Sequence, residues 1–153
     1  MLQKVLVWDA PTRTFHWLQA LSFLGAYLTS DSEKYRDIHV ALGYILFGLI
    51  VFRLLWGFAG TRYAKFNSFF FKPGQIMAYM MSLLKGKAEH FIGHNPVGSV
   101  AIWLLLSLGL TLGVSGVLLL QDDAPDIIEK IHDFATNAML VVIAVHLLGV
   151  FVS

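Results

Sequence analysis

Four apolar stretches, each about long enough to cross a lipid bilayer, limit what this chain can fold into more than any other feature. They occupy residues 14–30, 38–60, 96–121 and 127–152, and a helix needs roughly 20 largely apolar residues to cross the hydrocarbon. Hydrophobic residues make up 57% of the chain, charged residues 14%, and the mean hydropathy is +0.68, which excludes an ordinary soluble domain. We therefore predict one all-α membrane domain, residues 1–153, built as an antiparallel, up-and-down bundle of four transmembrane helices.

The first stretch is the shortest and follows charged residues, so a cleaved signal peptide is an alternative interpretation of it. It contains His16, Gln19 and Tyr27 and has no clear small-x-small cleavage site, which favours a retained helix. The chain has no cysteine, which excludes disulfides, iron–sulfur clusters and covalent haem attachment through a C-x-x-C-H motif. A cofactor would have to be held by histidine or carboxylate side chains.

The charges between the apolar stretches are distributed unevenly. The amino-terminal segment and the connection between the second and third stretches, counting Arg53, carry eight Lys or Arg residues and two acidic residues. The other side, counting the start of the fourth stretch, carries three basic and eight acidic residues. Because Lys and Arg remain preferentially in the cytoplasm, we expect both termini to be cytoplasmic and the acidic connections to lie on the opposite, outer side.

Two shorter features lie between the second and third stretches. Segment 73–86 is apolar and flanked by lysines, so we expect a short amphipathic helix along the cytoplasmic interface. The aromatic segment NSFFFKP, residues 67–73, is expected to anchor at the same interface. Asn95 followed by Pro96 is typical of a helix start, since Asn caps the first turn and Pro fits the first helical position.

The fourth stretch carries two histidines, His132 and His146, in mostly apolar surroundings. Fourteen residues of α-helix make almost four turns, so the two side chains point within about 40° of each other and lie roughly 21 Å apart along the axis. His132 is near the outer end of the stretch, and His146 is in its inner half. Ionisable residues are costly inside a membrane, which favours a functional interpretation of both.

Two further histidines match these depths in an antiparallel bundle. His16 lies near the inner start of the first stretch, and His39 near the outer start of the second. His16 is thereby paired with His146, and His39 with His132. Two imidazoles facing each other across a bundle are suitable axial ligands for a six-coordinate haem iron, so we predict two haems. The alternatives are hydrogen bonds to neighbouring helices and a zinc site, which would need four ligands instead of two.

Arg53 follows His39 by fourteen residues and therefore lies on the same stripe of the second helix, at the inner level. Its guanidinium can bind the propionates of an inner haem through bidentate hydrogen bonds. Alternatively, it snorkels to the cytoplasmic headgroups. Gly43 and Gly149 leave space beside predicted ligands, although ordinary helix packing explains them equally well.

The third stretch contains no candidate ligand in its centre and is expected to form a wall of the bundle. Its Gly109 and Gly113 have the small-xxx-small spacing of a helix contact. His90 and His94, just before this stretch, are expected to be solvated or to cap a helix. The alternative is a propionate contact or part of a quinone pocket.

Several segments together resemble the bacterial cytochrome b561 family, which includes the cytochrome b subunits of nickel–iron hydrogenases. They are WDAPTRTFHW (8–17), HVALGYILFGLIVFRLLWG (39–57), HNPVG (94–98) and the histidine pair of the fourth stretch, and they cover nearly the whole chain. The resemblance implies a four-helix membrane cytochrome with two non-covalent b haems, whose ligands carry over onto His16, His39, His132 and His146. Members usually continue with a basic cytoplasmic tail, whereas this sequence ends at Ser153, so a site built by such a tail is not predicted here.

The resemblance also implies electron exchange, in the bacterial inner membrane, between the quinone pool and a redox partner. The partner is expected to be a cytochrome c, a hydrogenase subunit or a dehydrogenase subunit, and the acidic outer face would complement a basic partner. Membrane lipid is expected around the helices, and no nucleic-acid partner is expected. The chain is expected to be an electron-transfer subunit; the alternatives are a self-sufficient quinone oxidoreductase and a haem-free membrane anchor or metal-ion transporter.

Overall fold

The computed structural model describes residues 9–86 and 94–152, and this part of the chain forms five α-helices and no strand. The all-α prediction is therefore confirmed. Two short 3₁₀ helices, Glu33–Tyr35 and Phe66–Ser68, lie in the connections before α2 and before α3. The α-helices are α1 (Ala10–Thr29), α2 (Arg36–Ala59), α3 (Pro73–Leu84), α4 (Pro96–Leu118) and α5 (Asp126–Val152).

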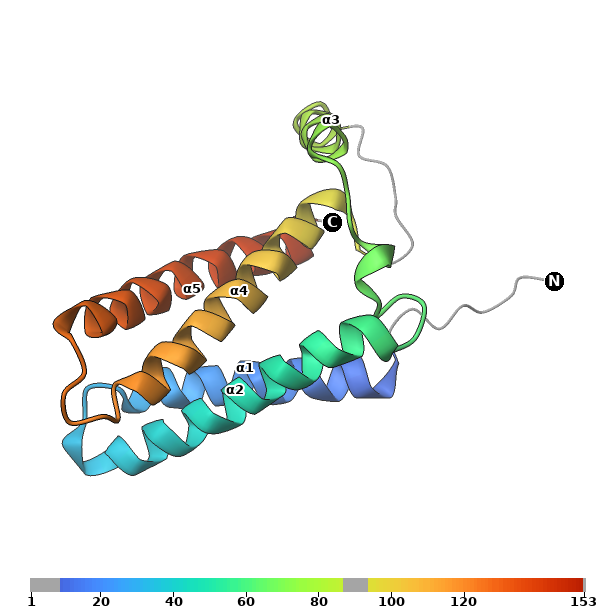
Figure 1. Ribbon diagram of the computed structural model, residues 1–153. Helices are drawn as coiled ribbons and strands as arrows, with labels where there is room; N and C mark the ends of the chain where they lie inside the picture. Colours follow the sequence, from blue (N-terminus) through green and yellow to red (C-terminus); the bar gives the residue numbers. More distant parts are fainter. Residues whose placement is uncertain (1–8, 87–93, 153) are drawn as a thin grey trace.

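Helices α1, α2, α4 and α5 run beside one another in alternating directions (Figure 1). α1 packs against α2, α2 against α4, and α4 against α5. The starts of α1 and α4 and the ends of α2 and α5 lie at one end of this bundle, which we call the inner end. The α1–α2 and α4–α5 connections form the outer end, and α3 stands off the bundle at the inner end, where it packs against α4.

Within the part of the chain that the structure describes, three segments are long and apolar enough to cross a membrane: Glu33–Ala59, which includes α2, Pro96–Leu118 and Asp126–Phe151. α1 is not among them, although it has 20 residues. Charged or polar side chains such as Arg13 and His16 lower the hydropathy of its first half. Membrane crossing by α1 therefore stays a prediction, which its packing along α2 favours.

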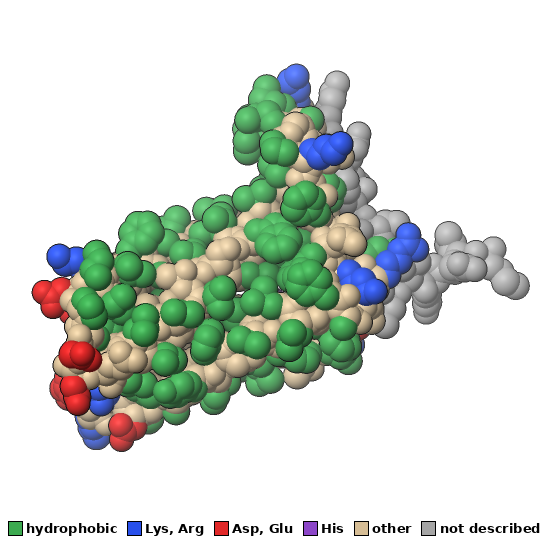
Figure 2. Space-filling view, in the orientation of Figure 1, with side chains coloured by type: hydrophobic (Ala, Val, Ile, Leu, Met, Phe, Trp, Pro, Cys, Tyr) green, Lys and Arg blue, Asp and Glu red, His purple; other side chains and the backbone are tan. Residues whose placement is uncertain are grey.

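The sides of the bundle expose many large apolar side chains, as expected of a surface that faces lipid. Leu21, Phe58 and Leu148, for example, are 62%, 75% and 65% exposed. Hydrophobic side chains cover the helices in Figure 2, while Asp and Glu gather at the outer end beside a few Lys and Arg, and in this view the inner end and α3 carry Lys and Arg alone. This separation of charge is the pattern on which the predicted orientation depends.

Helix α4 approaches α2 closely through two glycines. A Cβ atom on Gly109 would lie 2.7 Å from the Cδ1 atom of Ile50, and one on Gly113 would overlap the ring of Phe47. Ile50 is completely buried at this contact. The predicted helix contact through the small-xxx-small spacing is therefore confirmed, and its partner is α2.

Gly113→Ala is expected to lower the stability of the fold, because the added methyl group must displace the Phe47 ring. Overpacking of this kind costs typically about 1–3 kcal/mol. Gly48→Ala is the matched control, since a Cβ there would meet nothing within 4 Å and alanine favours a helix over glycine by about 1 kcal/mol. Thermal unfolding in detergent checks both variants; equal melting temperatures for the two would contradict the close contact.

Asp9 ties the inner ends of α1 and α2 together. Its Oδ1 atom caps α1 by accepting from the Thr12 N–H at 2.7 Å, and its Oδ2 atom accepts from Thr61 Oγ1 at 2.7 Å and from Trp56 Nε1 at 3.3 Å. Burial alone would raise the pKa of Asp9, but these hydrogen bonds outweigh it and hold the pKa below its usual value. The carboxylate is therefore charged at neutral pH and fixes the end of α2, near Arg53.

Candidate functional site

The structure brings the four histidines together in two pairs. At the inner end, the ring centres of His16 on α1 and His146 on α5 lie 6.5 Å apart. At the outer end, the ring centres of His39 on α2 and His132 on α5 lie 6.4 Å apart. His16 is exposed and the other three are half-buried. These are the two pairs that the depth of each histidine predicts.

The separation within each pair suits two ligands on opposite sides of one metal ion. A histidine–metal bond is about 2 Å long and the nitrogen lies about 1 Å from its ring centre, which places two opposed ring centres roughly 6 Å apart. The rings are inclined by 49° in the inner pair and 68° in the outer pair. Each ring can rotate about its bond to a metal, so these inclinations do not prevent a shared ion.

Helix α5 stands away from the helices that carry the opposite histidines. It packs closely against α4, whereas within the described residues its backbone makes no comparably close contact with α1 or α2. Gly43 follows His39 by one turn and Gly149 follows His146, and a Cβ on either glycine would meet nothing within 4 Å. The histidine pairs are therefore flanked by open space, as a flat macrocycle between the helices requires.

Both outer histidines use their Nδ1 atom in a hydrogen bond. His39 Nδ1 lies 2.7 Å from the carbonyl oxygen of Ala26, and His132 Nδ1 lies 2.8 Å from Ser115 Oγ. A carbonyl oxygen only accepts, so His39 carries a proton on Nδ1, and Nε2 is the ring nitrogen left to bind a metal. Metal-binding histidines are commonly held in this way by a partner of the second ring nitrogen.

The Ala26 carbonyl is available because α1 ends just beyond it. The N–H of Ser30 bonds to the Tyr27 carbonyl, at 3.3 Å, so the last turn is tightened. Carbonyl groups in the last turn of a helix have no N–H partner further along the helix. The end of α1 thus supplies the acceptor that orients His39 on the neighbouring helix.

Arg53 lies buried at the inner end of α2. It is only 4% exposed, and its guanidinium carbon lies 5.4 Å from the centre of the Phe66 ring and 5.8 Å from that of Phe69. Its Nη1 atom is buried and has no hydrogen-bond partner among the described residues. A snorkelling arginine would expose its guanidinium, so that alternative does not fit. A buried cation with an unused donor is suited to an anionic ligand.

His94 lies next to the same aromatic side chains. Its ring centre is 4.9 Å from that of Phe69, and the residue is half-buried, so the expectation of a solvated His94 is wrong. Burial, together with the positive charge of Arg53, lowers the pKa of His94 to about 4. The ring is therefore neutral at physiological pH. His90, its predicted companion, lies outside the described residues.

Phe69 corrects a second expectation at this end of the bundle. It belongs to the aromatic segment predicted to anchor at the interface, but it is 1% exposed and packs with Ile50, Phe66 and Leu106. Its neighbour Phe70 is 74% exposed, so the predicted role as an interface anchor still fits Phe70. The connection before α3 thus folds back over the inner end and covers Arg53.

The described residues do not offer a donor set for a zinc ion. No group of three or more His, Cys, Asp or Glu side chains in this part of the chain is arranged to hold a metal. Structural zinc takes four such ligands. The histidines occur in twos, which suits a metal whose remaining ligands come from a macrocycle.

Sequence reasoning missed Ser115 and the Ala26 carbonyl as partners of the outer histidines. Ser115 lies near the outer end of the third stretch, at the depth of His132, and this match in depth was the available signal. The Ala26 carbonyl carries no signal in the side chain at all. It becomes visible only when the end of α1 and the start of α2 are placed in space.

An all-α membrane fold with histidine side chains paired across the bundle is the architecture of a membrane b-type cytochrome. The chain belongs to the prokaryotic cytochrome b561 family, whose model matches residues 7–153. It is thus a membrane cytochrome of the b type, and membership of the family implies haem b as its cofactor.

Individual relatives agree with this assignment. The chain is 26% identical over 148 residues to the probable Ni/Fe-hydrogenase B-type cytochrome subunit of Rhizobium leguminosarum bv. viciae, covering 80% of this chain and 62% of the relative. The subunit of the same name from Azotobacter vinelandii is 29% identical over 143 residues, covering 75% of this chain and 59% of the relative. The probable Ni/Fe-hydrogenase 1 B-type cytochrome subunit of Escherichia coli (strain K12) is 25% identical over 145 residues, covering 76% and 60%.

The chain spans about 60% of the length of these curated relatives. No solved structure matches it.

Proposed function

We propose that this chain carries electrons across the membrane through two non-covalent b haems. His16 and His146 are the axial ligands of the inner haem, and His39 and His132 those of the outer haem. The observation that carries the proposal is the separation of 6.5 Å and 6.4 Å between the ring centres in two pairs at opposite ends of α5. The open space beside Gly43 and Gly149 supports the same arrangement.

The residues of the chain fix where and how each cofactor is held. Haem b supplies one-electron iron chemistry when it is bound at each pair. Histidines on both sides leave no coordination position for oxygen, so the sites are suited to electron transfer. Because α5 contributes His132 to one pair and His146 to the other, a single helix sets their separation at roughly 21 Å along its axis.

Arg53 is the proposed contact for the propionates of the inner haem. Its buried guanidinium has an unused Nη1 donor, and a carboxylate is the anion that a guanidinium binds best in a bidentate manner. The aromatic rings of Phe66 and Phe69 hold the guanidinium in place. The neutral ring of His94 is the second proposed contact on the same side.

In the proposed topology all four long helices, α1 included, cross the bacterial inner membrane, and both termini are cytoplasmic. α3 lies along the cytoplasmic interface, where its exposed Met77, Met81 and Leu84 would meet lipid. The excess of Lys and Arg on the inner side supports this orientation. Tags at the amino terminus and in the α4–α5 connection, tested for accessibility in intact cells, distinguish it from the reverse orientation.

The proposed partners are the quinone pool and a hydrogenase. Relatives named as B-type cytochrome subunits of Ni/Fe-hydrogenase support the hydrogenase. The acidic outer end offers complementary charge to a basic surface on such a partner. A cytochrome c and a dehydrogenase subunit are the competing partners, and co-purification from membranes that contain each of them separates the three.

Haem content tests the central claim. Purified protein from haem-sufficient cells is expected to carry about two haems per chain, since each histidine pair holds one. Pyridine haemochrome absorbance, divided by protein concentration from amino-acid analysis, gives the ratio. A ratio near one would show that only one of the two sites binds haem. A preparation without a Soret band would instead support the alternative of a haem-free membrane anchor.

A further inference from the structure

Ser115 on α4 is the hydrogen-bond partner of His132 on α5. The Oγ atom of Ser115 lies 2.8 Å from Nδ1 of His132, and Ser115 is 3% exposed. The contact joins α4, which carries neither of the paired histidines, to the proposed outer haem site. α4 therefore contributes a side chain to the proposed outer site, whereas its sequence predicts only a packing role in the bundle.

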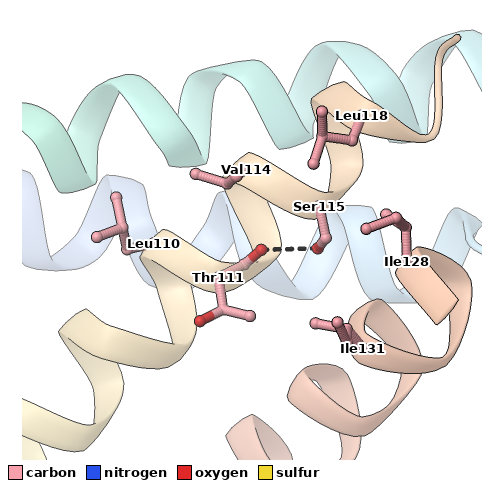
Figure 3. Close-up of a pocket in the computed structure, with 7 residues that line it drawn as sticks. All are labelled: Leu110, Thr111, Val114, Ser115, Leu118, Ile128 and Ile131. Carbon is pink, nitrogen blue, oxygen red and sulfur yellow. Dashed lines mark hydrogen bonds between the residues drawn. The ribbon is translucent and has the colours of Figure 1, made fainter. Parts of the chain in front are cut away.

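The direction of this hydrogen bond follows from the other contacts of Ser115. Its hydroxyl donates to the Thr111 carbonyl at 2.6 Å, a bond drawn in Figure 3, and lies 3.3 Å from the Leu112 carbonyl. Carbonyl oxygens only accept, so the single hydroxyl hydrogen is used on the helix itself. With the hydroxyl hydrogen assigned to the Thr111 carbonyl, Ser115 accepts from His132, and this assignment places the proton of the ring on Nδ1 and the lone pair on Nε2.

The side chains around Ser115 favour its hydrogen bond to His132. The serine borders a mainly apolar groove between α4 and α5, lined also by Leu110, Thr111, Val114, Leu118, Ile128 and Ile131 (Figure 3). The Thr111 hydroxyl donates to the Ser107 carbonyl at 2.9 Å, and the other side chains are apolar, so His132 is the side-chain partner of Ser115. A Cβ on the next residue, Gly116, would lie 3.5 Å from the Cε1 atom of the His132 ring, so the ring packs directly on α4.

His132 differs in this respect from the other three histidines. His39 donates to the Ala26 carbonyl of the main chain, which no side-chain substitution removes. The rings of His16 and His146 have no hydrogen-bond partner among the described residues. His132 is therefore the histidine whose Nδ1 partner is a replaceable side chain.

We infer that Ser115 is a positioning residue of the outer site, whose hydroxyl fixes the tautomer and the ring orientation of His132 and so sets the reduction potential of the outer haem. The inference rests on the proposed function, because it takes His132 as an axial ligand. An acceptor at Nδ1 increases the basicity of Nε2, and a more basic ligand favours the oxidised iron. Removing the acceptor should raise the outer potential.

Ser115→Ala tests the inference, and Ser107→Ala is its matched control. Ser107 lies on the same helix, and its hydroxyl bonds only to the Trp103 carbonyl of its own helix. Redox titration of the purified dihaem protein, followed in the α band, is expected to show a positive shift of the outer potential in Ser115→Ala and no shift in Ser107→Ala. Electron paramagnetic resonance of the oxidised protein should show changed g values for the outer haem only.

A second variant covers the case in which Ser115→Ala does not retain its haems. Ser115→Cys keeps the size of the side chain but replaces the hydroxyl by a weaker acceptor, so the outer potential should move in the same direction by a smaller amount. The inner potential, identified in His132→Ala, is the internal reference in both variants. An outer potential that is unchanged in the dihaem form of either variant would overturn the role of Ser115.

Failure of the proposed function gives a different result. If His132 is not a ligand, His132→Ala itself would keep two haems. Ser115 can then have no role at a haem, and the proposed function fails first. Loss of one haem in His132→Ala together with unaltered potentials and g values in Ser115→Ala would reject the positioning role alone.

Discussion

His132→Ala is expected to reduce the haem content from about two to about one per chain. The substitution removes one of the two protein ligands of the outer haem and leaves a cavity at the site, while the inner pair is untouched. The ring centres of His16 and His146 lie at the other end of α5, roughly four helical turns away. Independent sites at that separation should lose haem independently.

The measurement is the haemochrome ratio combined with electron paramagnetic resonance of the oxidised protein. One low-spin signal should disappear and the other should keep its g values. His39→Ala is expected to leave the same inner haem, with the same potential, because it empties the same site from the opposite helix. Asn137→Ala is the control on α5: the side chain is exposed and bonds only to the Asp133 carbonyl of its own helix, so both haems should remain.

Equal loss of both haems in His132→Ala and in His39→Ala would contradict two independent pairs. Circular dichroism must accompany the haem assay, because α5 carries a ligand of each pair and its unfolding would empty both sites. A variant with native helix content and no haem would show that the outer haem is needed for binding the inner one. Retention of two haems in both variants would show that His39 and His132 are not haem ligands.

The pairing of the histidines could be predicted from the sequence because it depends only on regular backbone geometry. The rise of an α-helix fixes the distance between His132 and His146. Short connections make neighbouring helices antiparallel, which places His16 and His39 at opposite ends. No side-chain packing enters this argument, and the structure brings together the two pairs that it predicts.

The contribution of α4 could not be predicted in the same way. The sequence of α4 is apolar apart from small hydroxyl residues, and Ser107, Thr111 and Ser115 on one face each bond a carbonyl of their own helix. Such a stripe does not show which face turns toward α5. The rotation of α4 is set by the fit of Gly109 and Gly113 against Ile50 and Phe47 on α2. Only this packing turns Ser115 toward His132.

The burial of Arg53 also depends on tertiary structure. The position of Arg53 at the inner level follows from its spacing to His39, but a residue at that depth can either snorkel or be covered. The connection before α3 decides between these states by folding Phe66 and Phe69 over the guanidinium. The aromatic residues of this connection are also typical of an interface anchor, and composition alone does not distinguish the two roles.

Arg53→Leu is expected to lower the reduction potential of the inner haem and to leave the outer potential unchanged. A positive charge favours the reduced iron, because reduction removes one positive charge from the site. A unit charge roughly 10 Å away, at an effective dielectric constant of about 20, contributes about 1.7 kcal/mol, or about 70 mV for one electron. The outer haem is more distant and screened, so redox titration should resolve one moving and one fixed potential.

Two controls separate charge from hydrogen-bond geometry. Arg62→Leu removes an exposed cation at the same end of the bundle, and solvent should screen its effect to a small fraction of that of Arg53. Arg53→Lys keeps the charge but not the bidentate geometry, so its inner potential should lie between those of the native protein and Arg53→Leu. If Arg53→Leu shifts neither potential, the guanidinium does not face the inner haem. If Arg53→Lys shifts the inner potential as far as Arg53→Leu does, the hydrogen bonds to the propionates, rather than the charge, set that potential.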